Sequence, residues 1–248
     1  MERALITLTP SEAKRLIGKA VAKMEPIKAA LKKGIIVICL GTTNAFVAEE
    51  ILGMKIEKGR FAIGIITSHG TCITNPDYRL KELIIRDGKL TELTIKDVLD
   101  ELGPNDVFIK GANAIDPYGN AGVFLGSPTG GTLGISIGVL LSRGVKIIIP
   151  VSLEKFTPYP IDDLILRLGN RRFNYSMKMP VGMMLLPGEI VTEIEAFKIL
   201  FECECIPIGG GGINGGERCY LLEGEKLEEV WKEIMKIKGE EKIIVEEE

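Results

Sequence analysis

Hydrophobic residues along this chain follow two alternating patterns. Short runs rich in isoleucine and valine are typical of buried strands; the run at 35–40 is continuously apolar, and those at 106–109 and 145–151 are strand-like. Between them, apolar residues recur every three or four positions, as in helices, at 9–32, 45–52 and 135–143. This alternation predicts an α/β fold in three layers, with a mostly parallel open sheet and helices on both faces.

Turn and capping signals mark the ends of these elements. Thr9 and Pro10 predict the start of the first helix, and Pro26 predicts a kink within it. Asp87-Gly88 lies between two apolar segments and favours a type I′ turn, so we expect a small antiparallel hairpin inserted at 80–93. The chain shows neither an internal repeat nor a linker, which predicts a single domain over residues 1–248.

Composition narrows the class of protein. The 248 residues are 46% hydrophobic, enough for a sizeable core, and the net charge of −3 gives no strong field that would attract nucleic acid or an anionic membrane. No apolar run reaches the length of a membrane-spanning helix, and the first ten residues lack a signal-peptide pattern. We therefore expect a soluble cytoplasmic protein with neither nucleic-acid nor membrane partners.

The cysteine and histidine content predicts neither disulfides nor a metal site. Five cysteines form no CxxC pair, and His69 is the single histidine, so we expect no metal and no cofactor. Glutamine is absent while Lys, Glu and Ile are abundant, a composition similar to that of thermophile proteins.

The loop over 110–134 carries the strongest candidate chemistry. It joins a buried strand to a helix, the position at which α/β proteins bind ligands. Asn113 and Asp116 are its candidate catalytic side chains. Its candidate ligand-binding residues are Lys110, Gly111, Ala112, Gly130, Gly131 and Thr132. The alternative is a long connection made only of turns.

Two further loops join this candidate site. The residues Gly41, Thr42, Thr43 and Asn44 follow the first buried strand and begin a helix, where hydroxyl and N–H groups hold anions, although a plain helix cap needs the same residues. The segment 209–217 contains six glycines and ends at Glu217, another candidate catalytic carboxylate. The alternative for 209–217 is a flexible surface loop.

Three segments, in this order, resemble the superfamily of ribose-5-phosphate isomerase, glucosamine-6-phosphate deaminase, CoA transferases and DeoR-type sugar-sensing domains. Residues 38–45 (ICLGTTNA) look like its sugar-phosphate loop. Residues 110–117 (KGANAIDP) are similar to the isomerase motif DGADEIDP and the repressor motif GANGID. Residues 145–156 (VKIIIPVSLEKF) look like the strand that ends in Ser-Lys. The resemblance implies the same α/β fold, a homo-oligomer and Lys155 as a further catalytic candidate.

Departures from the family motifs remove the known isomerase chemistry. Lys110 and Asn113 stand where the isomerase has two catalytic-loop aspartates, and only Asp116 matches. The isomerase lysine and glutamate fall on Val123 and Thr132, so the carboxylate base that isomerisation needs is missing. The deaminase histidine and the DNA-binding half of the repressors have no counterpart either.

The sequence thus predicts a small-molecule enzyme that acts on an anionic, phosphorylated metabolite without the isomerase's catalytic acids. In this hypothesis Asp116 is the acid or base, and Lys155 or Lys110 balances the charge. A non-catalytic sensor of sugar phosphates or other metabolites is the alternative. A CoA transferase-like enzyme, with Glu217 or Glu154 as nucleophile, is a third.

Overall fold

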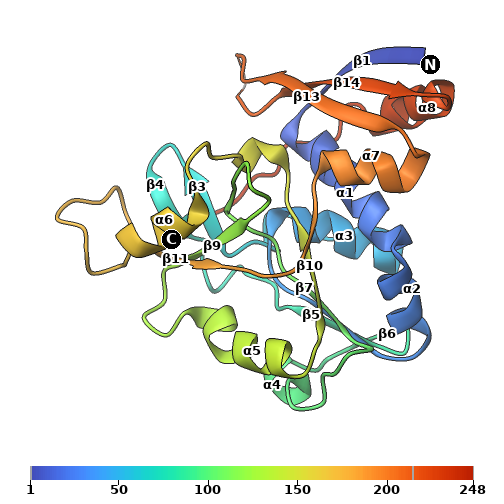
Figure 1. The fold of residues 1–248 in the computed structure, drawn as a ribbon. Helices are drawn as coiled ribbons and strands as arrows, with labels where there is room; N and C mark the ends of the chain where they lie inside the picture. Colours follow the sequence, from blue (N-terminus) through green and yellow to red (C-terminus); the bar gives the residue numbers. More distant parts are fainter. Residues whose placement is uncertain (1, 214, 248) are drawn as a thin grey trace.

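A six-stranded sheet forms the centre of the molecule in the computed structural model, which describes residues 2–213 and 215–247 (Figure 1). Its strands, in spatial order, are β12 (Glu189–Val191), β10 (Lys146–Pro150), β7 (Val107–Ile109), β2 (Ile35–Ile38), β5 (Leu83–Arg86) and β6 (Lys89–Thr91). The first four run parallel, whereas β5 and β6 are antiparallel to their neighbours. The sheet is therefore mixed, with a parallel half that contains the fully apolar runs.

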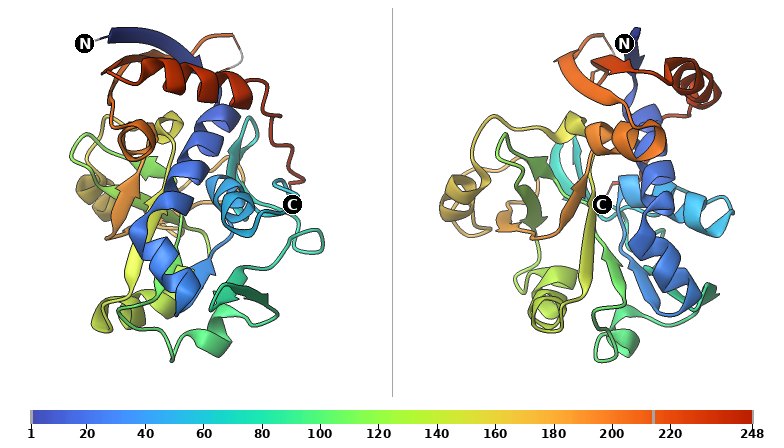
Figure 2. Two further views of the ribbon diagram at one scale, coloured as in Figure 1. Left: turned by 90° about the vertical axis from the view of Figure 1, so that its right-hand side faces the viewer. Right: turned by 45° about the vertical axis from the view of Figure 1, so that its right-hand side comes forward.

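Helices cover both faces of this sheet. On one side lie α1 (Pro10–Lys23), α2 (Glu25–Lys32) and α3 (Thr42–Leu52), and on the other lies α5 (Gly131–Ser142) (Figures 1 and 2). The single kinked helix expected over 9–32 is two helices, because the backbone turns out of helical geometry at Met24 and Pro26 then stands in the first turn of α2. At the start of α1, Thr9 and Glu12 form a reciprocal capping box.

The hairpin predicted near residues 80–93 is present, but it is not an insertion. Strand β5 pairs along its whole length with β2, so the hairpin is the edge of the central sheet. Asp87 and Gly88 have φ angles of 49° and 76°, both in the left-handed region that a type I′ turn requires. The turn residues predicted the hairpin correctly, but no local sequence pattern indicates that β5 pairs with β2.

Three smaller antiparallel sheets, which the sequence did not predict, surround the centre. They comprise β1 (Glu2–Leu8), β14 (Arg218–Gly224) and β13 (Glu204–Gly210); β11 (Gly182–Leu185), β9 (Ala121–Leu125) and β8 (Ala114–Ile115); and β3 (Gly64–Thr67) with β4 (Gly70–Ile73). The remaining elements are α4 (Ile95–Val98), the 3₁₀ turn η1 (Leu153–Lys155), α6 (Ile161–Arg167), α7 (Glu193–Phe201) and α8 (Leu227–Ile237). The molecule is accordingly a mixed α/β structure.

One large apolar core joins these layers. The central strands are buried along β2 and β7, and the inward side chains of β1 and β14, such as Leu8 and Tyr220, belong to the same cluster. None of the helices in the described part of the chain has the length and apolar character that crossing a membrane requires.

Candidate functional site

Three loops meet because three neighbouring strands are parallel. Strands β10, β7 and β2 lie side by side and point the same way, so their carboxyl ends share one edge of the sheet. The segments that follow them are 152–155, 110–113 and 41–44. The sequence predictions for these three loops therefore converge on one place.

The three loops enclose a small cavity of about 80 Å³, which we call the central pocket. It is lined by Gly41, Thr42, Thr43, Lys110, Gly111, Ala112, Asn113 and Lys155, together with Leu40, Ile63, Gly64, Val123 and Phe124. Seven of the predicted ligand-binding and catalytic positions in the first two loops are thus neighbours in space, and Lys155 borders the same cavity.

Two lysines give the central pocket its charge. Lys155 Nζ donates a hydrogen bond to the carbonyl oxygen of Ala112 at 2.8 Å. Within the described residues, neither Lys155 nor Lys110 forms an ion pair with a carboxylate. Burial lowers the pKa of Lys110, and burial together with the charges of Lys14 and Lys110 lowers the pKa of Lys155 to about 8.

The start of α3 adds polar groups to the same pocket. Gly41 precedes the helix in an extended conformation and provides no side-chain cap, so the N–H groups of the first turn keep their hydrogen-bonding capacity. The side chain of Thr43 is only 2% exposed, and its hydroxyl has no hydrogen-bond partner among the described residues. Unsatisfied donors at a helix N-terminus favour an anionic ligand.

Asn44 holds two of the loops together and lies outside the cavities that the others line. Its Nδ2 donates to the carbonyl oxygen of Cys39 at 2.8 Å and, more weakly, to that of Ile109 at 3.4 Å. The side chain is fully buried between β2 and β7. Its predicted role in direct ligand contact has no counterpart in this geometry; it fixes the position of the loops that do line the pocket.

Asn113 stands at the junction of three cavities. Its Oδ1 accepts a hydrogen bond from the Phe124 N–H at 3.0 Å, which leaves the Nδ2 donors for whatever enters. It borders the central pocket and both of the larger cavities described below. Its position fits a ligand-orienting donor better than an acid or base, because an amide does not titrate.

The structure gives Asp116 a different place from the one predicted. Its Oδ1 accepts from the N–H groups of Tyr118 and Asn120, both at 2.9 Å, and its Oδ2 accepts from Asn120 Nδ2 and the Ile161 N–H, both at 3.0 Å. The side chain is 3% exposed and borders none of the cavities around the central pocket. Burial raises the pKa of Asp116, but these hydrogen bonds outweigh it and hold the pKa below its usual value. Asp116 thus organises the turn and the start of α6.

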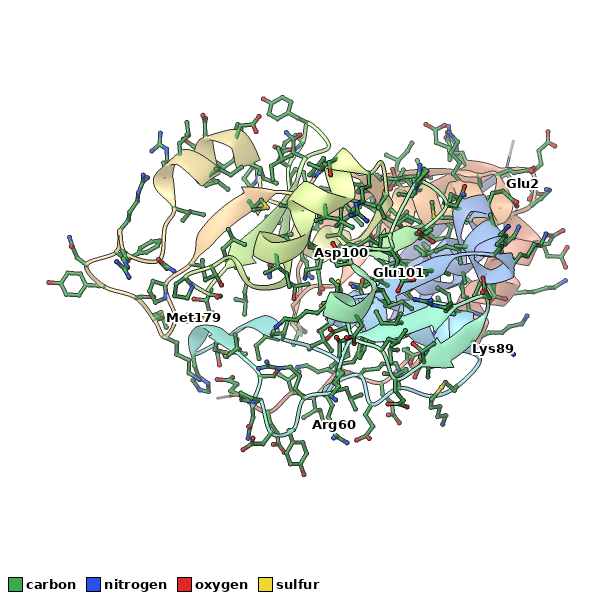
Figure 3. The ribbon with its side chains drawn as sticks, turned by 90° about the horizontal axis from the view of Figure 1, so that it is seen from below. Glu2, Arg60, Lys89, Asp100, Glu101 and Met179 are labelled. Carbon is green, nitrogen blue, oxygen red and sulfur yellow. The ribbon has the colours of Figure 1, made fainter. Side chains whose placement is uncertain are left out.

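A cavity of about 340 Å³, which we call the apolar cavity, adjoins the central pocket. Lys110, Asn113 and the predicted residues Gly130, Gly131 and Thr132 form its polar rim, at the uncapped start of α5. The remaining wall is largely hydrophobic and includes Ile65, Val123 and Met179. Met179 lies on the side of the molecule away from Glu2 (Figure 3).

A third cavity, of about 470 Å³, opens on the other side of Lys155, and we call it the tail cavity. Glu154 and Lys14 meet in its wall as an ion pair with an N–O distance of 2.6 Å. Gly215 and Gly216 of the predicted glycine loop also border it, as do Ile243 and Val245 of the C-terminal segment. The third loop of the prediction therefore reaches the site, through its glycines.

Glu217 does not reach this cavity. Its Oε2 is buried without a hydrogen-bond partner inside the β13–β14 hairpin, and it borders none of the three cavities. Glu154, the other carboxylate considered as a nucleophile, does border the tail cavity, where Lys14 neutralises it.

A buried carboxylate supports the loop that carries Lys155. Glu193 at the start of α7 accepts hydrogen bonds from the Ser152 hydroxyl at 2.7 Å and from the Leu153 N–H at 2.9 Å. The side chain is fully buried, and burial raises its pKa. These bonds fix η1, and with it Lys155, relative to the sheet.

Several site residues escaped sequence reasoning. Lys14 is a charged residue on the buried face of α1, and this break in an apolar helix face was its available signal. The segment 63–65 borders the cavities through backbone and aliphatic atoms, so no residue type marked it. Among residues 2–213 and 215–247, no group of three or more His, Cys, Asp or Glu side chains is placed to hold a metal.

No family model matches this sequence, and comparison with curated proteins returns no match. Among solved structures, the chain is similar to ribose 5-phosphate isomerase A from Neisseria gonorrhoeae, with 17% sequence identity over 94% of this chain and 86% of that chain and a TM-score of 0.35.

Proposed function

We propose that this protein is a small-molecule enzyme that acts on an anionic, phosphorylated metabolite bound at the central pocket. The observation that carries the proposal is the pair Lys110 and Lys155, which share this pocket with Thr43 and form no ion pair with any carboxylate in the described part of the chain. Two half-buried ammonium groups repel each other, and an anion that joins them offsets this repulsion. A phosphate group matches both their charge and the N–H groups of α3.

Two larger cavities beside the pocket support a ligand that extends beyond its phosphate. The apolar cavity and the tail cavity both contact Asn113, so a metabolite with its phosphate in the central pocket has room on either side. Small metabolites bind in such clefts, with few polar groups to orient them.

Thermal unfolding in the presence of ligands tests the proposal. Inorganic phosphate and ribose 5-phosphate, at about 100 times their Kd, are expected to stabilise the protein by about 2.7 kcal/mol. The Lys110→Met variant should fold, because methionine replaces a buried charge at similar volume, and should lose this stabilisation. The control Lys146→Met removes an exposed lysine at the opposite end of β10 and should retain it. Equal ligand effects in both variants would contradict the proposal.

A metabolite sensor is the second candidate, and the engagement of Asp116 by four hydrogen-bond donors favours it, since the predicted acid or base is not available. Following each stabilising ligand by ³¹P NMR separates the two functions. Conversion of the ligand supports the enzyme, and binding without conversion of any ligand in the panel supports the sensor. Stabilisation by CoA alone would point to the CoA transferase-like alternative.

A further inference from the structure

Lys155 occupies the boundary between the central pocket and the tail cavity. It borders both spaces, and its hydrogen bond to the Ala112 carbonyl oxygen fixes the amine at this boundary. That bond uses one N–H, so an uncharged amine held in this way keeps its lone pair for a ligand. Thr42, Gly64 and Asn113 also line both spaces, and Lys155 is the residue of this shared set that carries an amine.

The charges that face Lys155 increase the fraction of its amine that is uncharged, although the ammonium form that attracts a phosphate still predominates at neutral pH. Lys14 and Lys110 are its cationic neighbours, and the adjacent carboxylate of Glu154 is ion-paired with Lys14 at 2.6 Å. A lysine that is desolvated and placed beside other cations is the arrangement that makes a lysine amine nucleophilic. The lowered pKa of Lys155, about 8, agrees with this geometry.

We propose that Lys155 is a catalytic nucleophile that forms an imine with the aldehyde or ketone group of the phosphorylated metabolite. This inference rests on the proposed function, because phosphate in the central pocket is what brings the carbonyl carbon to Lys155. The ligand class is thereby narrowed to phosphorylated aldehydes and ketones.

The step balances without an oxidant or a reductant. The Lys155 Nζ lone pair forms a bond to the carbonyl carbon, and the π electrons of the C=O bond move to oxygen. Both amine hydrogens pass to that oxygen, which leaves as water while the nitrogen lone pair completes the C=N bond. A later hydrolysis reverses the same bonds and returns the free amine.

Trapping with pyridoxal 5′-phosphate, an aldehyde that carries a phosphate, tests this inference. Borohydride reduces any imine to a stable secondary amine, and peptide mass spectrometry then locates it. We expect modification of Lys155 in about one-to-one ratio, competition by inorganic phosphate, and a labelling rate that rises with pH through about 8. The Lys155→Arg variant should lose this label, and the control Lys146→Arg should retain it.

Labels spread over surface lysines without competition by phosphate, or an unmodified Lys155, would overturn the imine. The outcome is separable from failure of the proposed function, because stabilisation by inorganic phosphate needs no carbonyl group. Phosphate stabilisation without trapping at Lys155 removes this inference alone, whereas the absence of both removes the two proposals together.

Discussion

At the residue scale, ligand-site residues differ from structural residues in how many hydrogen bonds a charged side chain can still form. Asp116 and Lys155 are both charged residues that follow strands in the sequence. All four hydrogen bonds of the Asp116 carboxylate are made within the protein, whereas Lys155 makes one and has no ion-pair partner in the described part of the chain. A side chain whose bonds are complete stabilises the fold, and one with spare bonds can act on a ligand.

The Asp116→Asn substitution is expected to destabilise the protein while leaving the phosphate affinity of the folded state unchanged. Each carboxylate oxygen accepts two N–H groups, so either orientation of the asparagine amide places its NH₂ against two donors. Leaving buried donors unsatisfied costs about 1–3 kcal/mol each, so a loss of about 2–6 kcal/mol is expected in urea unfolding. The exposed Asp77→Asn is the matched control.

The stability lost in Asp116→Asn should depend on pH, and the lowered pKa of Asp116 sets the direction of that dependence. Because the pKa of Asp116 is lowered in the folded state, its contribution is present above the unfolded-state value of about 3.9 and disappears as the pH falls through the folded-state value. The difference in unfolding free energy between wild type and Asp116→Asn should therefore shrink on acidification. A difference that stays constant with pH would contradict the lowered pKa of Asp116. Reduced phosphate binding by the folded variant would show that Asp116 takes part in the ligand site after all.

At the element scale, the sequence predicted the strands that carry the site because their apolar runs are continuous. The strands β2, β7 and β10 were all expected, and so were the loops after them. The short strand β12 and strand β13 were missed, because a three-residue strand and a glycine- and proline-interrupted one carry little periodic signal. The pairing of β2 with β5 depends on residues about 50 positions apart, which local patterns do not encode.

The contact between α7 and η1 allows a prediction about how Lys155 is positioned. The Glu193→Ala change leaves the Ser152 hydroxyl and the Leu153 N–H without their acceptor. It should lower the free energy of unfolding by about 2–4 kcal/mol and should also weaken phosphate binding. Glu193→Gln keeps an amide oxygen for Leu153 and an N–H for the Ser152 oxygen, so phosphate binding should recover. Calorimetric titration with phosphate measures this. Equal phosphate affinity in Glu193→Ala and wild type would show that Glu193 supports the fold without positioning Lys155.

At the scale of the whole molecule, the two ends of the chain meet the site from outside the central sheet. After α8 the chain descends past α1 toward β3 and β4 (Figure 2). The Glu12 side chain accepts from the Gly239 N–H at 3.0 Å, and the Asn75 N–H donates to the Glu246 carbonyl oxygen at 3.2 Å. On the way, Ile243 and Val245 form part of the wall of the tail cavity. No motif in the sequence connected this segment to the site, since its contribution depends on where α8 ends.

Removing residues 242–248 should affect the tail cavity and leave the central pocket unchanged. The central pocket contains none of these residues, so binding of inorganic phosphate should be unchanged. Reductive labelling of Lys155 by pyridoxal 5′-phosphate should need higher reagent concentrations, because the tail cavity loses the apolar wall formed by Ile243 and Val245. The substitution Ile244→Ser is the matched control, since that side chain is 84% exposed and does not line the tail cavity. Equal weakening of phosphate and aldehyde binding by the truncation would show that residues 242–248 affect the whole site. The proposal that the non-phosphate part of the ligand occupies the tail cavity would then be wrong.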